Sequence, residues 1–162
     1  RKEGVALCSR LLKKSNLKFD KILVDAPCSG EGTLRKSPKT FLMWNLNMIK
    51  KIAGVQRRLV DGAIRLLKVG GEMIYSTCTL SPEEDEMIVD YLIKNFDVSV
   101  ERIKLPLKFR CGVCEWEGKS LDKGVSRCLR LYPQDNDTDG FFVAKIKKLS
   151  EGGVRYENPN TR

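Results

Sequence analysis

The chain has 162 residues, of which 41% are hydrophobic, so we expect one folded domain with a core and not a disordered chain. It has no histidine, which excludes catalytic triads, general bases and metal sites that depend on histidine and leaves proton transfer to Asp, Glu, Cys, Lys or water. Lysine and arginine number 30 against 21 acidic residues, and this net charge of +9 would attract a polyanion such as RNA, although a merely basic surface has the same composition.

The first elements form a helical pattern, a strand and a long helix. Residues 4–14 are weakly amphipathic, and Cys8 fits there as a small buried residue. The apolar run within Lys21–Ala26 predicts a buried parallel strand, followed by a loop. A helix over 46–68, ended by the glycine pair 70–71, is predicted by apolar residues at intervals of three, four or seven: Ile49, Ile52, Leu59, Ala63 and Leu66.

The second half continues the alternation of strands and helices. Residues 72–76 predict a second buried strand. A helix then follows with Ser81 as cap, Pro82 in the first position and Glu84 third, and its inner face consists of Met87, Ile88, Tyr91 and Leu92. We expect further strands over 98–103 and 140–146, an irregular stretch over 105–138, and a loose tail. This order predicts an α/β fold with right-handed crossovers on a mainly parallel sheet.

Two cysteine motifs follow the two buried strands. They are Asp25-Ala26-Pro27-Cys28-Ser29-Gly30 and Ser76-Thr77-Cys78-Thr79. Carboxyl ends of neighbouring parallel strands meet at one edge of a sheet, so both thiols and Asp25 should lie together. A single cysteine at a strand end is more often simply buried, but two beside an acid favour an active site. A thiolate can add to C6 of a cytosine, and a nearby acid can bind the edge of the base.

These motifs and the residues around them resemble the RNA 5-methylcytosine methyltransferases of the Nop/Sun family. The resemblance runs from about residue 17 to 148, and its matching stretches are residues 19–33, 56–57, 66–71, 75–84, 130–133 and 139–145. It implies a partial Rossmann-like fold that binds S-adenosylmethionine, with an antiparallel last strand.

The resemblance also implies roles for individual residues. Cys78 would be the nucleophile that adds to cytosine C6, and Cys28 would assist the breakdown of the adduct. Asp25 would lie between cofactor and base, and Pro27 would shape the wall of the cofactor pocket. The residues alone do not decide which thiol attacks, since DNA cytosine methyltransferases use the Pro-Cys thiol; the Thr-Cys match to the RNA family favours Cys78. The target base must be unpaired or flipped out.

One part of the family pattern has no counterpart in this sequence. The cofactor loop, with its Asp-x-Cys-Ala-Pro-Gly-like string, does not occur. The resemblance therefore implies that residues 1–148 are the carboxyl-terminal part of the catalytic domain and 149–162 a flexible tail. We expect an uncovered sheet edge beside residues 22–24, to be completed by an amino-terminal half or a partner chain.

The basic residues of the loop after Cys28 are the expected RNA contacts. Arg35, Lys36 and Lys39 follow the first motif and can grip the RNA backbone. A second basic run, residues 101–110, fits a solvated face equally well. On the resemblance alone, we expect tRNA as the substrate in preference to rRNA.

The sequence also bears on the cellular location of the protein and on two alternative functions. The sequence has no apolar run of about 18 residues and does not begin like a signal peptide, so we expect a cytoplasmic protein without membrane contact. An inactive or regulatory RNA-binding fragment is one alternative. A metal-dependent or redox protein is another, because Cys111, Cys114 and Cys128 supply three of the four ligands of a zinc site; plain thiols or a disulfide fit these cysteines better, and we expect no metal.

Overall fold

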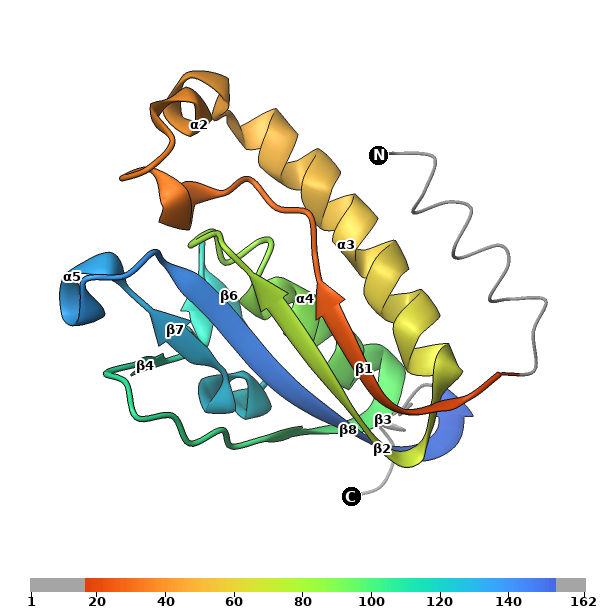
Figure 1. Cartoon of the computed structure of the whole chain (residues 1–162). Helices are drawn as coiled ribbons and strands as arrows, with labels where there is room; N and C mark the ends of the chain where they lie inside the picture. The colour runs from red at the N-terminus through yellow and green to blue at the C-terminus, as the bar shows by residue number, and fades with distance from the viewer. Residues whose placement is uncertain (1–16, 154–162) are drawn as a thin grey trace.

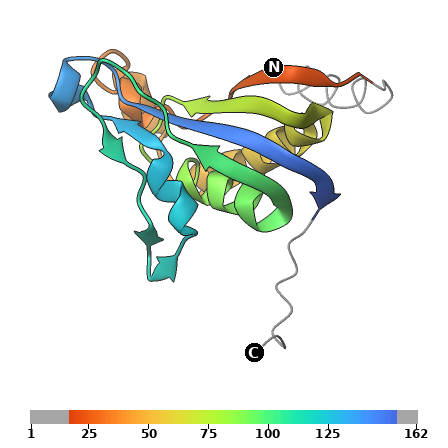
Figure 2. The same ribbon diagram turned by 90° about the horizontal axis from the view of Figure 1, so that it is seen from below.

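The computed structural model describes residues 17–153, which form one main sheet with two helices packed on one face. The strands run in the order β1 (Phe19–Asp25), β2 (Leu67–Thr77), β8 (Phe141–Gly153), β7 (Leu129–Leu131) and β4 (Arg110–Cys111), and β3 (Phe96–Glu101) pairs with the other half of β8. The long helix α3 (Leu46–Leu66) and α4 (Glu86–Asn95) lie behind the sheet in Figure 1, and the view from below in Figure 2 shows both on the same side.

Short elements fill the connections. The loop after β1 contains a 3-10 turn, η1 (Glu31–Thr33), and the helix α2 (Pro38–Met43). The stretch expected to be irregular also contains a two-stranded hairpin of β5 (Glu115–Trp116) and β6 (Lys119–Ser120), then η2 (Lys123–Arg127) and α5 (Pro133–Asn136). Five of its residues also belong to strands of the main sheet, in β4 and β7.

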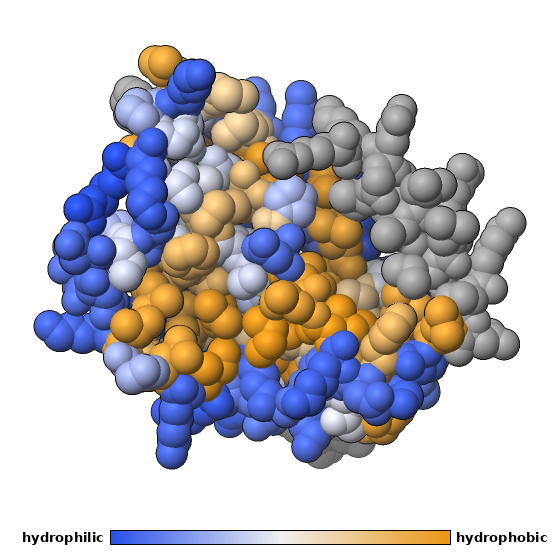
Figure 3. Space-filling view, in the orientation of Figure 1, coloured by the Kyte–Doolittle hydropathy of each residue, from blue (hydrophilic) through white to orange (hydrophobic). Residues whose placement is uncertain are grey.

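The first strand is confirmed, but its expected burial is wrong. Leu23 is 69% exposed. Within the described range, β1 pairs only with β2, and Leu23 and its register partner Ile74 lie on the face opposite the helices. Figure 3 shows apolar side chains gathered over this face of the sheet. The prediction of an uncovered edge beside residues 22–24 is confirmed for the part of the chain that the structure describes.

The strand directions differ in part from the expectation. The α/β class and the antiparallel last strand are confirmed, since β8 runs antiparallel to β2. Of the pairings between described strands, only β1 with β2 is parallel, so the parallel part of the sheet is smaller than expected. The cause is the long strand β8, which pairs with β2 on one side and with β3 and β7 on the other.

The long helix is confirmed, with two corrections. It ends at Leu66, and the glycine pair lies inside β2 instead of stopping the helix. A side chain at Gly71 would lie 2.9 Å from the carbonyl oxygen of Asp20, so glycine there allows β1 to approach. The buried face is Ile49, Ala53, Gln56, Val60, Ala63 and Ile64, whereas the expected Ile52, Leu59 and Leu66 are only partly buried. Gln56 is buried because its amide makes internal hydrogen bonds.

The helix after the second motif begins later than expected. α4 starts at Glu86, because residues 81–85 form turns in which the carbonyl of Ser81 accepts from the amide of Glu84. The expected cap, Ser81, instead donates its hydroxyl to Glu31 at 3.2 Å. Of the predicted inner face, Ile88 and Leu92 are fully buried, while Met87 and Tyr91 are partly buried.

The core lies between the sheet and the two helices. Tyr75 of β2 and Phe142 of β8 are fully buried and meet edge to face, with ring centroids 6.3 Å apart. The expected third strand lies at Phe96–Glu101, and the last strand continues to Gly153, so it runs past residue 148. The domain division at residue 148 stays a prediction. The predictions for residues 4–14, Cys8 and 154–162 lie outside the described residues.

Gly32 marks the closest approach between two loops. A side-chain carbon there would lie 2.3 Å from the carbonyl oxygen of Gly140, whose amide donates to the Gly32 carbonyl at 2.9 Å. We expect Gly32→Ala to destabilise the fold by about 1–3 kcal/mol, because the two backbones must separate. Gly54→Ala is the matched control: nothing lies within 4 Å of that position in α3, so alanine should stabilise by about 0.5–1 kcal/mol. Urea unfolding measures both, and an unchanged Gly32→Ala protein would contradict this contact.

No helix in residues 17–153 is both long and apolar enough to span a membrane.

Candidate active site

The two motif cysteines lie side by side at the carboxyl ends of β1 and β2. These strands point to the same edge of the sheet in Figure 1. The Sγ atoms of Cys28 and Cys78 are 3.2 Å apart, both thiols are partly buried, and Asp25 is exposed at the end of β1. The structure therefore brings together the thiols and places the acid at the same edge.

The pKa values of the two thiols are shifted in opposite directions. A hydrogen bond from Cys28 lowers the pKa of Cys78 to about 7, although burial and the nearby carboxylates of Asp25 and Glu84 act against this. The same hydrogen bond, together with burial, raises the pKa of Cys28. At neutral pH about half of Cys78 is therefore ionised, and Cys28 stays the thiol that donates to the Cys78 thiolate.

This difference in acidity gives a test on the thiols themselves. The rate at which iodoacetamide alkylates Cys78 should rise through pH 7 and reach half its maximum there, because the thiolate is the reacting form. Cys28→Ala removes the donor, so the pKa of Cys78 rises and its alkylation at pH 7 should fall roughly ten-fold. Peptide mass spectrometry follows each cysteine separately. An unchanged pH profile in Cys28→Ala would contradict the assigned donor.

Direct hydrogen bonds join the two cysteine loops. The amide of Gly32 donates to the carbonyl of Cys78 at 2.9 Å, and the hydroxyls of Ser29 and Thr79 are 2.7 Å apart. The carboxylate of Glu31 accepts from the hydroxyls of Thr79 and Ser81, at 3.3 and 3.2 Å. These bonds fix the separation of the two thiols.

A buried carboxyl and a buried amide lie beneath the first loop. Glu84 Oε2 accepts from the amide of Ser29 at 2.9 Å and from Gln56 Nε2 at 3.0 Å. The same nitrogen of Gln56 donates to the carbonyl of Pro27 at 2.9 Å. Residues on both sides of Cys28 are thus held from inside the protein.

A buried ion pair supports the second loop. Arg130 is 3% exposed, and its Nε and Nη2 atoms bind Glu86 at 2.5 and 2.6 Å. Its Nη1 donates to the carbonyl of Leu80, two residues after Cys78, at 3.1 Å. Asp85 is also fully buried, which raises its pKa well above the usual range, and it accepts from Thr77 at 2.5 Å.

The basic loop is only partly available for RNA. Arg35 binds Asp137 at 2.7 Å and Lys36 binds Asp139 at 2.8 Å, so two of the expected contacts already have partners. Lys39 is exposed and forms no ion pair within the described range. An indole that sequence reasoning did not single out also lies here: Trp44 is 45% exposed, and its Nε1 donates to Glu31 at 2.5 Å.

Cys111, Cys114 and Cys128, the other cysteines of the described range, do not form a cluster suited to a metal. Cys128 is in the core, where burial raises its pKa well above the usual range, and Cys111 is exposed. Among the described residues there is no group of three or more His, Cys, Asp or Glu side chains that could hold a metal ion. The structure therefore gives no support to a zinc site made of Cys111, Cys114 and Cys128.

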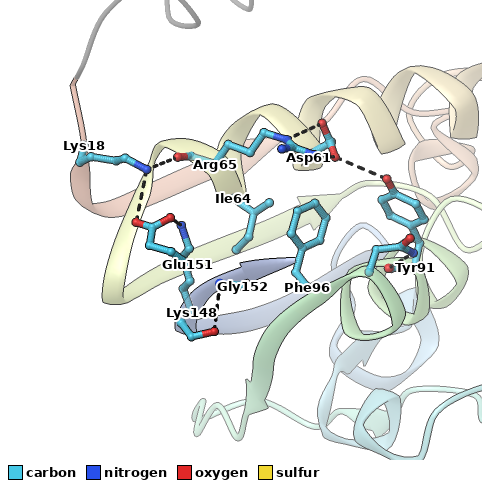
Figure 4. A pocket seen from close by; sticks show the side chains of 11 residues that line it. Lys18, Asp61, Ile64, Arg65, Tyr91, Phe96, Lys148, Glu151 and Gly152 are labelled. Atoms are coloured by element: carbon cyan, nitrogen blue, oxygen red, sulfur yellow. Dashed lines mark hydrogen bonds and ion pairs between the residues drawn. The ribbon is translucent and has the colours of Figure 1, made fainter. Parts of the chain in front are cut away.

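A cavity of about 390 Å³ lies at the opposite edge of the sheet, between the end of α3 and the end of β8. Each of its charged groups has an ion-pair partner, as Figure 4 shows: Arg65 binds Asp61 at 3.1 Å, while Lys18 and Lys148 share Glu151. It is separate from the thiols and contains no unpaired charge that would mark a ligand.

Asp25 and Pro27 suit one side of a cofactor pocket. Both are exposed at the carboxyl end of β1, next to the thiols, and a carboxylate there can accept hydrogen bonds from hydroxyl or amino groups. Both lie on or just after β1, the strand that pairs only with β2 among the described strands.

Known proteins are similar to this chain in sequence and fold. A family model described as 16S rRNA methyltransferase RsmB/F matches residues 7–147. A tRNA (cytosine(49)-C(5))-methyltransferase of Pyrococcus abyssi is 44% identical over 80% of this chain and 42% of its own length. A ribosomal RNA small subunit methyltransferase F of Shewanella piezotolerans is 45% identical over 82% of this chain and 26% of its own.

Solved structures agree with these relatives. A methyltransferase homologue from Pyrococcus horikoshii matches with a TM-score of 0.70 and 39% identity, over 83% of this chain and 40% of that one. NSun6 from the same organism, solved with SFG, matches with a TM-score of 0.70 and 34% identity, over 88% and 33%. The chain thus spans less than half the length of these relatives. Because the family model matches most of its residues and these folds agree, the chain belongs to the RsmB/F family of 16S rRNA methyltransferases.

Proposed function

We propose that the chain is the cysteine-bearing part of an S-adenosylmethionine-dependent RNA cytosine-C5 methyltransferase. The observation that carries this proposal is the pair of thiols 3.2 Å apart, in which the pKa of Cys78 is lowered to about 7. The names of the relatives, which include cytosine-C5 methyltransferases of tRNA, support the same reaction.

In the proposed reaction Cys78 is the nucleophile. Its thiolate adds to C6 of the cytosine, which makes C5 electron-rich enough to take a methyl group. The Cys28 thiolate then takes the C5 proton, the electron pair of the C5–H bond restores the C5–C6 double bond, and Cys78 departs as a thiolate. Cys28 assists this last stage: once Cys78 is a thioether, the thiolate that accepted the Cys28 hydrogen bond no longer exists, so Cys28 ionises more easily.

Asp25 and Pro27 would hold the methyl donor. S-adenosylmethionine supplies the methyl group when it is bound, and a relative was solved with SFG, an analogue of it. The Asp25 carboxylate would accept hydrogen bonds from the cofactor or from the edge of the base, and Pro27 would form part of the wall of the cofactor pocket. The thiols lie at the sheet edge, so the cytosine has to be unpaired or flipped out of a helix to reach them.

The RNA backbone would contact the loop after Cys28. Lys39 has no ion-pair partner among residues 17–153, and phosphate could replace Asp137 and Asp139 as the partner of Arg35 and Lys36. We propose tRNA as the preferred RNA over rRNA, because relatives of both kinds occur and the archaeal relative acts by name on tRNA.

The test uses Cys28→Ala in the full-length enzyme with cytosine-containing RNA and S-adenosylmethionine, since a C5 proton must be present for release to be measured. We expect a covalent protein–RNA band on a denaturing gel that accumulates and persists in this variant, since Cys78 can still attack but release is slow. A tRNA transcript should give more adduct than a small-subunit rRNA fragment. Absence of an adduct with either RNA would contradict the proposal.

The second candidate function is RNA binding without catalysis, because the described residues provide only one side of a cofactor pocket. Calorimetric titration of the 162-residue chain with S-adenosylmethionine separates the two. Micromolar binding would show that the chain forms a competent pocket. No binding would place the methyl donor's site in a longer polypeptide or a two-chain assembly.

A further inference from the structure

The loop that carries Cys28 rests on two polar side chains that are completely buried. Glu84 and Gln56 are both 0% exposed, although one follows the second cysteine motif and the other lies in the middle of α3. Through Pro27 and Ser29 they hold the residues on either side of Cys28, at 2.9 Å each.

Two of the four polar atoms in this pair have no partner when both side chains are drawn in their ordinary states. Glu84 Oε1 and Gln56 Oε1 are buried without a hydrogen bond within the described part of the chain. An ionised carboxylate and an amide oxygen can only accept, so neither can satisfy the other, and each buried acceptor left alone destabilises the protein. A hydrogen-bond donor between Glu84 Oε1 and Gln56 Oε1 would satisfy both atoms.

One proton supplies that donor. A protonated Glu84 carries an O–H on Oε1, which can donate to Gln56 Oε1, while Gln56 Nε2 already donates to Glu84 Oε2 at 3.0 Å. A carboxylic acid and a primary amide pair in this way through two hydrogen bonds. The remaining N–H of Gln56 is used by Pro27, so every donor of the amide is satisfied.

The charges around Glu84 agree with a neutral acid. Burial raises the pKa of Glu84, and the Glu31 carboxylate adds to the effect. No lysine or arginine in the described residues forms an ion pair with it, in contrast to neighbouring Glu86, which binds Arg130. An ionised Glu84 would also act against the thiolate of Cys78, so a neutral one helps to keep that nucleophile ionised.

We propose that Glu84 is protonated and forms with Gln56 a neutral acid–amide clamp that positions Cys28 against Cys78. Neither side chain is placed against the reacting atoms, so both are positioning residues. The role of the clamp in turnover rests on the proposed function, whereas its protonation state does not.

The protonation state is tested first, on the chain itself. Carbon-13 labelling of glutamate carboxyl carbons should show, by NMR at pH 7, a glutamate in the acid form whose signal is lost in Glu84→Gln. The variant should remain folded, because one N–H of the glutamine amide takes the place of the acid O–H. Finding every glutamate ionised at pH 7 would overturn the clamp.

Positioning is tested in the full-length enzyme with Gln56→Met, which keeps length and loses both amide donors. We expect kcat to fall roughly ten- to a hundred-fold while KM for RNA is unchanged, with the covalent adduct accumulating as in Cys28→Ala. Glu84→Gln should retain turnover, and Gln134→Met at an exposed position is the matched control. Normal turnover by a folded Gln56→Met enzyme would overturn the positioning role. If Gln56→Met does not fold, the NMR signal still decides whether Glu84 is protonated. If Cys28→Ala itself forms no adduct, the proposed function is wrong, but the acid–amide clamp is not affected.

Discussion

Replacing Cys78 by alanine should abolish both the covalent adduct and methyl transfer, lowering the rate by roughly 10⁴-fold or more. The expected loss is this large because no other group within the described site has the same combination of lowered pKa and position: the pKa of Cys28 is raised, and there is no histidine in the chain to act instead. Adduct formation on 5-fluorocytosine RNA and methylation from labelled S-adenosylmethionine measure the effect in the full-length enzyme.

The matched control for Cys78→Ala is Cys111→Ala. Cys111 is an exposed thiol outside the site, so its removal should leave both the adduct and methyl transfer unchanged. A Cys78→Ala enzyme that still forms an adduct, lost only when Cys28 is also replaced, would assign the attack to the Pro-Cys thiol.

Arg130→Met should destabilise the fold by about 3–5 kcal/mol. The substitution leaves Glu86 fully buried without its cation, which is the costly way to break a buried ion pair. A loss of this size is a large part of the total stability of an ordinary domain, about 5–15 kcal/mol. Urea unfolding measures it, and the second cysteine loop should loosen as well, because Arg130 also holds the carbonyl of Leu80.

Arg110 provides a matched control for this prediction. It also pairs with a carboxylate, Asp135 at 3.0 Å, and also lies over the ring of Tyr132, but the pair is exposed to solvent. Arg110→Met should therefore unfold at nearly the same urea concentration as the original chain. Adding Glu86→Gln to Arg130→Met should recover part of the loss, since glutamine removes the unpaired charge and can still accept from the amide of Val113. Equal effects of the two arginine substitutions would contradict the importance of burial.

The cysteine motifs could be predicted because their signal is local. Each follows a short apolar run, and parallel pairing of β1 with β2 brings Cys28 and Cys78 to one edge as expected. The pairing of β3 and β7 with β8 could not be predicted in this way, because the residue pattern of a strand does not specify which other strand it pairs with.

The polar residues beneath the site were missed for a physical reason. A run such as Glu83–Glu86 suggests a solvated face, and only the fold shows that three of its side chains are buried. The burial of Gln56 could have been predicted, because its spacing from Ile49, Ala53 and Val60 places it on the same buried face of the helix. Arg35 and Lys36 show the opposite error, since their charges are matched by Asp137 and Asp139, about a hundred residues away.

The central claim is that Cys78 and not Cys28 attacks the cytosine, and peptide mapping of a trapped complex tests it most directly. The full-length enzyme with both cysteines is trapped on 5-fluorocytosine RNA, treated with nuclease and digested with trypsin. Cys78 lies in peptide 69–94 and position 28 in peptide 22–35, so the two sites separate cleanly. We predict that the nucleotide mass is on peptide 69–94 at Cys78. Its appearance on any other cysteine, or on no peptide, would contradict the account.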